Sequence, residues 1–305
     1  MDFWRRSLNR YVLVSAFLLI ATTCHSAPKQ SDRVQIDIDA LQWIGESVDP
    51  VAHLLSEPAT CLVVEGDAAV VRGELLFKSP LMLGGQAAKS GISCAACHRN
   101  GRGNPDFTMV GITGSPGTAD VTNGFFSKHR ADKTFNPVFI PDLASVEGRT
   151  RVSRIDPGAL EIFLTGQVVE EFDGASPNHA VIADLAAYVR ALDDGHCKPG
   201  RTKPQTWQDE VTLLRSGARH INSIKLASSN SYVDAMRAAL GRLNARFPGS
   251  RSLVARERLI ELSRQLSKYP NASVSQRDLD MLEDALRQQE DNSLYQRAPL
   301  LAALQ

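Results

Sequence analysis

Apolar residues recur at the three- and four-residue spacing of amphipathic helices in two stretches of the first 200 residues, 68–77 and 180–192. Asn178 or Ser176 can cap the second helix, and Asp193-Asp194-Gly195 ends it. After residue 205 the same spacing predicts four more helices, near 207–221, 232–247, 253–266 and 279–286. The pattern therefore predicts an all-α protein whose C-terminal part is a helical bundle.

The first 27 residues have the pattern of a secretory signal peptide. Three arginines precede an apolar run over 11–23, and the small residues Ser26 and Ala27 mark a cleavage site. The run is too short to span a bilayer, because that takes about 20 apolar residues. We expect export to the periplasm, cleavage near Ala27 and no stable membrane span in the mature chain.

The mature chain divides into four parts. An arm at 28–65 precedes a segment at 66–197, and a linker at 198–204 that contains Pro and Gly precedes the bundle at 205–305. The bundle carries no chemical motif, so its hypothetical role is to dock a partner or to dimerise. With 43% apolar residues, 22% charged residues and a formal charge of zero, the composition argues against nucleic acid as a partner.

The strongest chemical signal is the run Cys94-Ala95-Ala96-Cys97-His98. This is the Cys-x-x-Cys-His pattern to which c-type haem is attached, with the thiols bonded to the haem and the histidine bound to iron. Half of a zinc site and a thioredoxin-like dithiol are the alternatives. The sequence has no second Cys-x-x-Cys or His-x-x-x-His, and Arg99 to Gly103 breaks a following helix. We therefore expect one covalent haem c.

Residues 99–136 are rich in Gly, Asn, Thr and Asp and lack helical periodicity. Long irregular segments inside a domain are often functional. Residues 99–136, called the covering segment below, could cover the haem face opposite His98. A disordered surface insertion is the alternative. Large apolar residues argue against disorder because they need burial. They are Phe107, Val110, Ile112, Phe125 and Phe126.

Several short segments within residues 66–194, taken in their order along the chain, resemble one haem domain of the bacterial di-haem cytochrome c peroxidase family, which includes MauG-type enzymes. The segments that carry the resemblance are Gly73-Glu74-Leu75-Leu76-Phe77, Ser79-Pro80-Leu81, Ser93 to His98, Asn136 to Val146 and Glu147-Gly148-Arg149. The resemblance implies a cytochrome c-like fold. Family members carry two haem domains, whereas this chain has one haem motif. We therefore favour electron transfer between partner proteins; a peroxidase-like enzyme or small-ligand sensor that uses an external electron donor is the alternative.

The second axial position of the iron separates these functions, because two strong ligands suit electron transfer and an open position binds small molecules. His129 in the covering segment is the first candidate, near where the family's distal histidine would fall. Met109 is the alternative, and an open site is the third possibility. If the site is open, Glu147 is a weak candidate for a catalytic acid.

The two cysteines of the mature chain outside the haem motif are Cys61 and Cys197. In an oxidising compartment they suggest one disulfide that joins the two ends of the haem segment, as residues 66–197 are called below. Two buried free thiols are the alternative. Arginines at 102, 130 and 149 could offset haem propionate charge, although each is more typical of a solvated surface residue.

Overall fold

The computed structural model describes residues 38–60, 62–63, 66–144, 152, 156, 158–192, 200–223 and 229–305. The signal peptide predicted at 1–27 lies outside them. The described part is predominantly helical, which confirms the all-α prediction at that level, with only short strands added. None of its helices is long and apolar enough to cross a membrane.

The two helices predicted around the haem motif are present and pack against each other. Helix α2 (Ala68–Phe77) begins after Asp67, whose side chain accepts hydrogen bonds from two backbone amides of the first turn. Helix α6 (His179–Ala191) begins after Asn178, whose side chain accepts a hydrogen bond from the Val181 amide, so the predicted cap is confirmed. The two helices cross closely at Gly73, where an added Cβ would lie 2.0 Å from the Asp184 carbonyl oxygen.

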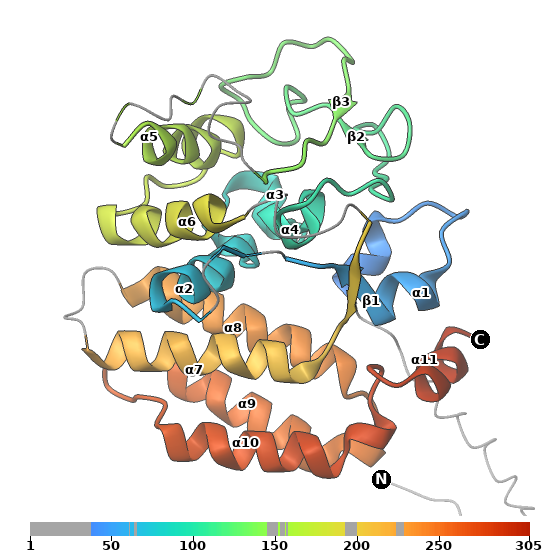
Figure 1. The fold of residues 1–305 in the computed structure, drawn as a ribbon, viewed down its shortest axis with the longest axis vertical. Helices are drawn as coiled ribbons and strands as arrows, with labels where there is room; N and C mark the ends of the chain where they lie inside the picture. The colour runs from blue at the N-terminus through green and yellow to red at the C-terminus, as the bar shows by residue number, and fades with distance from the viewer. Residues whose placement is uncertain are drawn as a thin grey trace, which may run out of the picture. The chain divides into compact units, whose positions relative to one another are not determined.

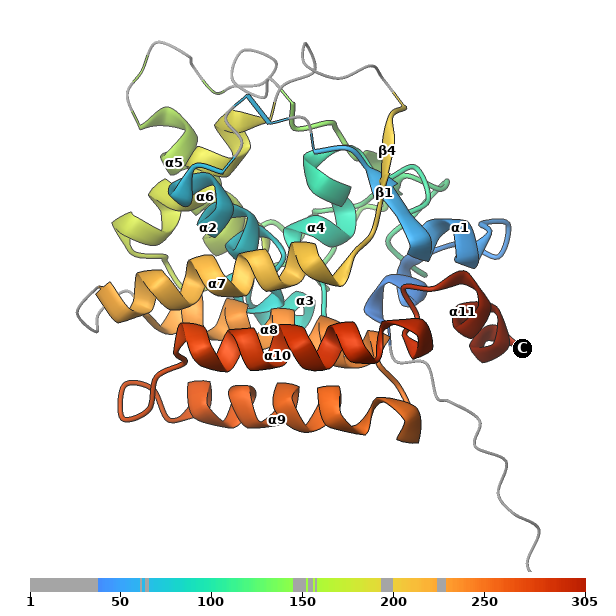
Figure 2. The same cartoon turned by 60° about the horizontal axis from the view of Figure 1, so that its bottom comes forward.

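The four predicted bundle helices are also present. They are α7 (Trp207–Ser223), α8 (Ser229–Arg246), α9 (Leu253–Ser267) and α10 (Gln276–Gln288). Figure 1 shows α6, α2, α7 and α10 stacked from top to bottom, and Figure 2 shows α9 and α10 side by side at the edge. The turn η5 (Ser250–Ser252) leads into α9, and η6 (Glu290–Asn292) leads to an unpredicted short helix, α11 (Arg297–Leu304).

Helix α2 contacts both α6 of the haem segment and α7 and α8 of the bundle. A buried network links these elements: Arg72 of α2 forms two hydrogen bonds to Asp184 of α6, and the hydroxyl of Tyr232 in α8 donates a third. One hydrophobic core runs through the same elements. Residues 34–305 accordingly form one compact unit.

The N-terminal arm packs against both the C-terminal elements and the segment around Phe107. It contains η1 (Asp39–Trp43), α1 (Pro50–Leu55) and β1 (Ser56–Pro58). Val51 and Leu54 share a buried cluster with Leu294 and Leu300. Strand β1 pairs antiparallel with β4 (Thr202–Pro204), so part of the predicted linker forms a strand.

The rest of the haem segment consists of short elements. They are η2 (Pro80–Met82), α3 (Gly85–Lys89), α4 (Cys94–Cys97), η3 (Arg99–Gly101), β2 (Thr118–Ala119), β3 (Val138–Phe139), α5 (Ala159–Gly166) and the π-helical turn η4 (Gln167–Glu171). Strands β2 and β3 pair antiparallel.

The covering segment 99–136 is folded around buried apolar side chains. Phe107, Ile112 and Phe126 are 0–2% exposed, which confirms the prediction that these large apolar residues are buried. Phe125 is partly buried against the same cluster. Val110 is 99% exposed, so the expectation that it needs burial is wrong; it lies at a turn where the chain reverses.

Candidate functional site

The site begins with α4, a single helical turn whose first and last residues are Cys94 and Cys97. Residues three apart on a helix lie on neighbouring positions of one face, so both thiols belong to the same side of the turn. Both cysteines are partly exposed and are free of disulfides. Burial of their sulfur atoms raises the pKa of each thiol to about 12.

His98 follows α4 and its ring has one defined partner. The Nδ1 atom lies 3.0 Å from the Pro141 carbonyl oxygen. Because a carbonyl oxygen only accepts, Nδ1 carries the proton and the lone pair is on Nε2. Burial lowers the pKa of His98 to about 4, against the opposing effects of Pro141 and Asp142, so the ring is neutral near pH 7. A neutral imidazole binds a metal through one ring nitrogen while the other ring nitrogen donates a hydrogen bond that orients the ring.

The segment that carries Pro141 is tied to the turn after His98. The Leu143 amide donates to the Gly101 carbonyl oxygen, and Arg102 forms a 3.0 Å ion pair with Asp142. Gly103 approaches this segment so closely that a Cβ would lie 2.8 Å from the Ile140 carbonyl oxygen. The expectation of a solvated Arg102 is wrong, since its side chain is 14% exposed.

Two apolar clusters meet at the cysteines. Cys94 packs against both, Ala95 against the core of α2 and α6, and Cys97 against a second cluster. The second cluster consists of Trp43, Leu83, Ala87, Ile92, Phe107, Ile112, Ala119 and Phe126. An apolar surrounding of this kind fits a porphyrin, whose faces are apolar and whose binding excludes water.

The structure separates the two candidates for the second axial ligand. Met109 is partly buried and packs against the same cluster as Cys97. His129 is exposed, and its backbone amide donates to the Ser127 hydroxyl. The arrangement therefore brings Met109, and not the His129 ring, to the apolar surroundings of the haem motif.

A buried carboxyl near the thiols was not predicted from the sequence. Glu171 in η4 is 9% exposed and pairs with Arg130 of the covering segment. Burial raises the pKa of Glu171 to about 7, although Arg130 acts in the opposite direction. Its charge also raises the pKa values of Cys94 and Cys97, so it lies within electrostatic range of both thiols. The sequence Glu170-Glu171 has no feature that indicates this burial.

Several predicted site residues lie outside the described residues: Glu147, Arg149, Cys61 and Cys197. The described neighbours of the two cysteines are nonetheless adjacent. The Val63 amide donates to the Ala191 carbonyl oxygen, and the Ala59 amide donates to the Arg201 carbonyl oxygen. The described residues on either side of Cys61 therefore lie beside those on either side of Cys197. The disulfide itself remains a prediction.

His53 and His220 have more specific surroundings than their sequence positions indicate. His53 is buried and hydrogen-bonds Asp106 at 3.0 Å. The ring of His220 is partly exposed and packs edge-on against Tyr232. Among the described residues, no group of three or more His, Cys, Asp or Glu side chains could hold a metal ion.

Comparison of the chain with protein-family models, with curated proteins and with solved structures finds no match.

Proposed function

We propose that the protein is an exported c-type cytochrome with one haem, which transfers electrons between partner proteins. The observation that carries the proposal is the geometry of His98, whose Nδ1 proton is held by Pro141 so that Nε2 is available to iron. Cys94 and Cys97 on the preceding helical turn would hold the haem through two thioether bonds. The bound haem would supply one-electron chemistry.

The chain's own residues have distinct parts in this proposal. Pro141 fixes the tautomer and orientation of His98, and the ion pair between Arg102 and Asp142 holds the segment that carries Pro141. The apolar clusters around α4 would exclude water from the haem faces. The resemblance to one domain of the di-haem peroxidase family supports a cytochrome c-like arrangement of α2, α4 and α6.

An exposed apolar surface supports the interaction with redox partners. Phe135, Val138 and Phe139 are 59–77% exposed, and Phe139 lies two residues before Pro141. Exposed apolar patches often mark protein interaction sites. The docking or dimerising role proposed for residues 205–305 has weaker support, from exposed Leu253, Val254 and Ile260 on α9.

The second candidate function is a peroxidase-like enzyme or small-ligand sensor. The buried carboxyl of Glu171 favours it, because a group with a pKa of about 7 can donate or accept a proton near neutral pH. This function needs an iron position that is open or easily vacated.

Absorption spectra of the mature holoprotein distinguish the two functions. A low-spin iron that is unaffected by cyanide and carbon monoxide supports electron transfer, and a high-spin iron that binds them supports the second function. The position of Met109 leads us to expect that Met109→Ala opens the iron to cyanide, whereas His129→Ala leaves the spectrum unchanged. The reverse result would establish His129 as the ligand.

A further inference from the structure

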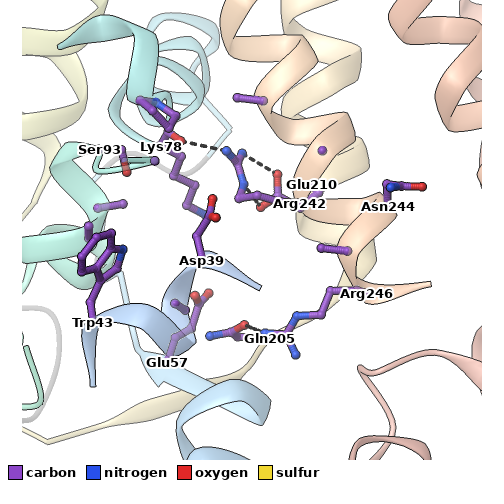
Figure 3. A pocket seen from close by; sticks show the side chains of 18 of the residues that line it. Asp39, Trp43, Glu57, Lys78, Ser93, Gln205, Glu210, Arg242, Asn244 and Arg246 are labelled. Atoms are coloured by element: carbon purple, nitrogen blue, oxygen red, sulfur yellow. Dashed lines mark hydrogen bonds and ion pairs between the residues drawn. The ribbon is translucent and has the colours of Figure 1, made fainter. Parts of the chain in front are cut away.

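A cavity borders the haem motif, and its lining includes neither Cys94 nor Cys97. Its volume is about 840 Å³, within the range of small-molecule sites. Ala95 and Ala96 of the haem motif, and Arg99 directly after it, line one part of it. The N-terminal arm and helices α7 and α8 contribute further lining residues, and Figure 3 shows side chains from these elements facing a common space.

The lining of this cavity is cationic. Five cationic side chains and three carboxylates border it: Lys78, Arg99, Arg242, Arg246 and Arg256, against Asp39, Glu57 and Glu210. Outside the lining, Glu74 pairs with Lys78, and Lys203 pairs with both Glu57 and Asp209. Arg242 is neutralised by a bidentate pair with Glu210, which Figure 3 shows. Arg99 and Arg246 lack a bidentate carboxylate partner of this kind among the described residues.

Neutral acceptors at the end of α1 orient both Arg99 and Arg246. Arg99 donates to the carbonyl oxygens of His53 and Ser56, and Arg246 donates to the carbonyl oxygen of Leu54, the residue after His53. Arg246 also donates to the Gln205 amide oxygen at 2.6 Å, and its charge lies over the Tyr295 ring.

These two guanidinium groups lack close carboxylate partners among the described residues. Arg246 is 5% exposed, and no described carboxylate lies within the 4.0 Å of an ion pair from it. Arg99 has only Asp106, at 3.9 Å. Burial lowers the pKa of each arginine, and this effect exceeds the opposing effect of the more distant Glu57 carboxylate. The charge of Arg99 lowers the pKa of Arg246 further. A bound anion would relieve this cost of burying two like charges.

Trp43 adds an unpartnered hydrogen-bond donor to the same cavity. The residue is 9% exposed, and its buried indole Nε1 has no hydrogen-bond partner among the described residues. Figure 3 shows the nitrogen edge of the indole turned toward the cavity. Buried polar atoms are rarely left without a partner, so an acceptor in the cavity is expected.

We propose that this cavity binds a small organic acid, with a carboxylate on Arg99 and Arg246. Planar guanidinium groups match carboxylate oxygens, the two arginines have no described carboxylate closer than 3.9 Å, and the volume exceeds what a single inorganic ion fills. Trp43 would donate to an oxygen of the ligand. The inference does not rest on haem attachment, because Cys94, Cys97 and His98 are not among the lining residues.

Calorimetric titration of the full mature protein tests this proposal, with succinate and glutarate as probes, inorganic phosphate as the comparison and chloride to keep ionic strength constant. We expect saturable binding of a dicarboxylate with Kd below about 1 mM. Arg246→Gln should weaken it at least tenfold. Arg264→Gln, on the exposed surface of α9, is the matched control and should leave it unchanged.

Gly241 provides a variant that preserves the arginines. It lines the cavity from α8, and a Cβ there would meet no atom within 4 Å. Gly241→Leu should therefore fill the cavity and abolish binding without loss of thermal stability, whereas Gly241→Ala should retain binding. The proposal is overturned if neither dicarboxylate binds above chloride, if phosphate binds as tightly as both, or if Gly241→Leu binds like the wild type.

Discussion

Asp184 is the residue whose loss tests most directly that the haem segment and the C-terminal bundle share one core. Its carboxylate receives two hydrogen bonds from Arg72 of α2 and one from Tyr232 of α8, while Asp184 belongs to α6. The side chains of Arg72 and Asp184 are 17% and 9% exposed. Asp184→Ala therefore leaves a nearly buried guanidinium without its counterion and a buried hydroxyl without its acceptor.

Removal of one partner from a buried ion pair costs about 3–5 kcal/mol. A typical domain has a free energy of unfolding of about 5–15 kcal/mol, so the variant should lose a large share of its stability. Tyr232→Phe removes only the hydroxyl and should cost about 1 kcal/mol. Glu261→Ala, which breaks the exposed pair with Arg264, should change stability by less than about 1 kcal/mol.

Urea unfolding, followed by far-ultraviolet circular dichroism and by haem absorbance, measures these differences. Because the network joins both segments, the two signals should change at one midpoint in the wild type and shift together in Asp184→Ala. A loss below 1 kcal/mol, or a shift in only one of the two signals, would refute the argument that the segments are one cooperative unit.

Three other predictions concern single positions. Gly73→Ala should destabilise the fold by about 1–3 kcal/mol in urea titrations, because its Cβ would overlap the Asp184 carbonyl oxygen and separate α2 from α6; unchanged stability would contradict the crossing. Burial raises the pKa of Glu171 from 4.5 to about 7, so the folded state binds this proton more tightly and stability falls by up to about 3 kcal/mol between these pH values. Glu171→Gln should reduce that decline, and an identical pH dependence would count against it. Cys61→Ser or Cys197→Ser should each lower the free energy of unfolding by about 2–5 kcal/mol and expose one new thiol to titration, whereas two free thiols in the wild type would exclude the disulfide.

The helices could be predicted because their signals are local. The boundaries of α2 follow from apolar spacing and from the Asp67 cap, and α6 follows in the same way from Asn178. Helix α11 lacks such a signal, since its apolar residues run together in Pro299-Leu300-Leu301 and are placed by contact with α1.

The Cys-x-x-Cys-His motif can be found in the sequence because five consecutive residues carry it, and the haem that it suggests remains a prediction. The surroundings of the motif could not be predicted, because they depend on contacts between distant segments. Pro141 reaches His98 across 43 positions, and Arg130 reaches Glu171 across 41. Arg246 meets the carbonyl oxygen of Leu54 across 192 positions, so no local pattern could have indicated the cavity that Arg99 and Arg246 border.

Covalent haem content is the measurement that tests the central claim most directly. The mature chain is produced together with a haem-attachment system, and the denatured protein is examined by mass spectrometry and by its absorption spectrum. We predict one covalently bound haem per chain in the wild type and none when Cys94 and Cys97 are both replaced by serine. A wild-type chain that acquires no haem under conditions in which another c-type cytochrome matures would contradict the proposal.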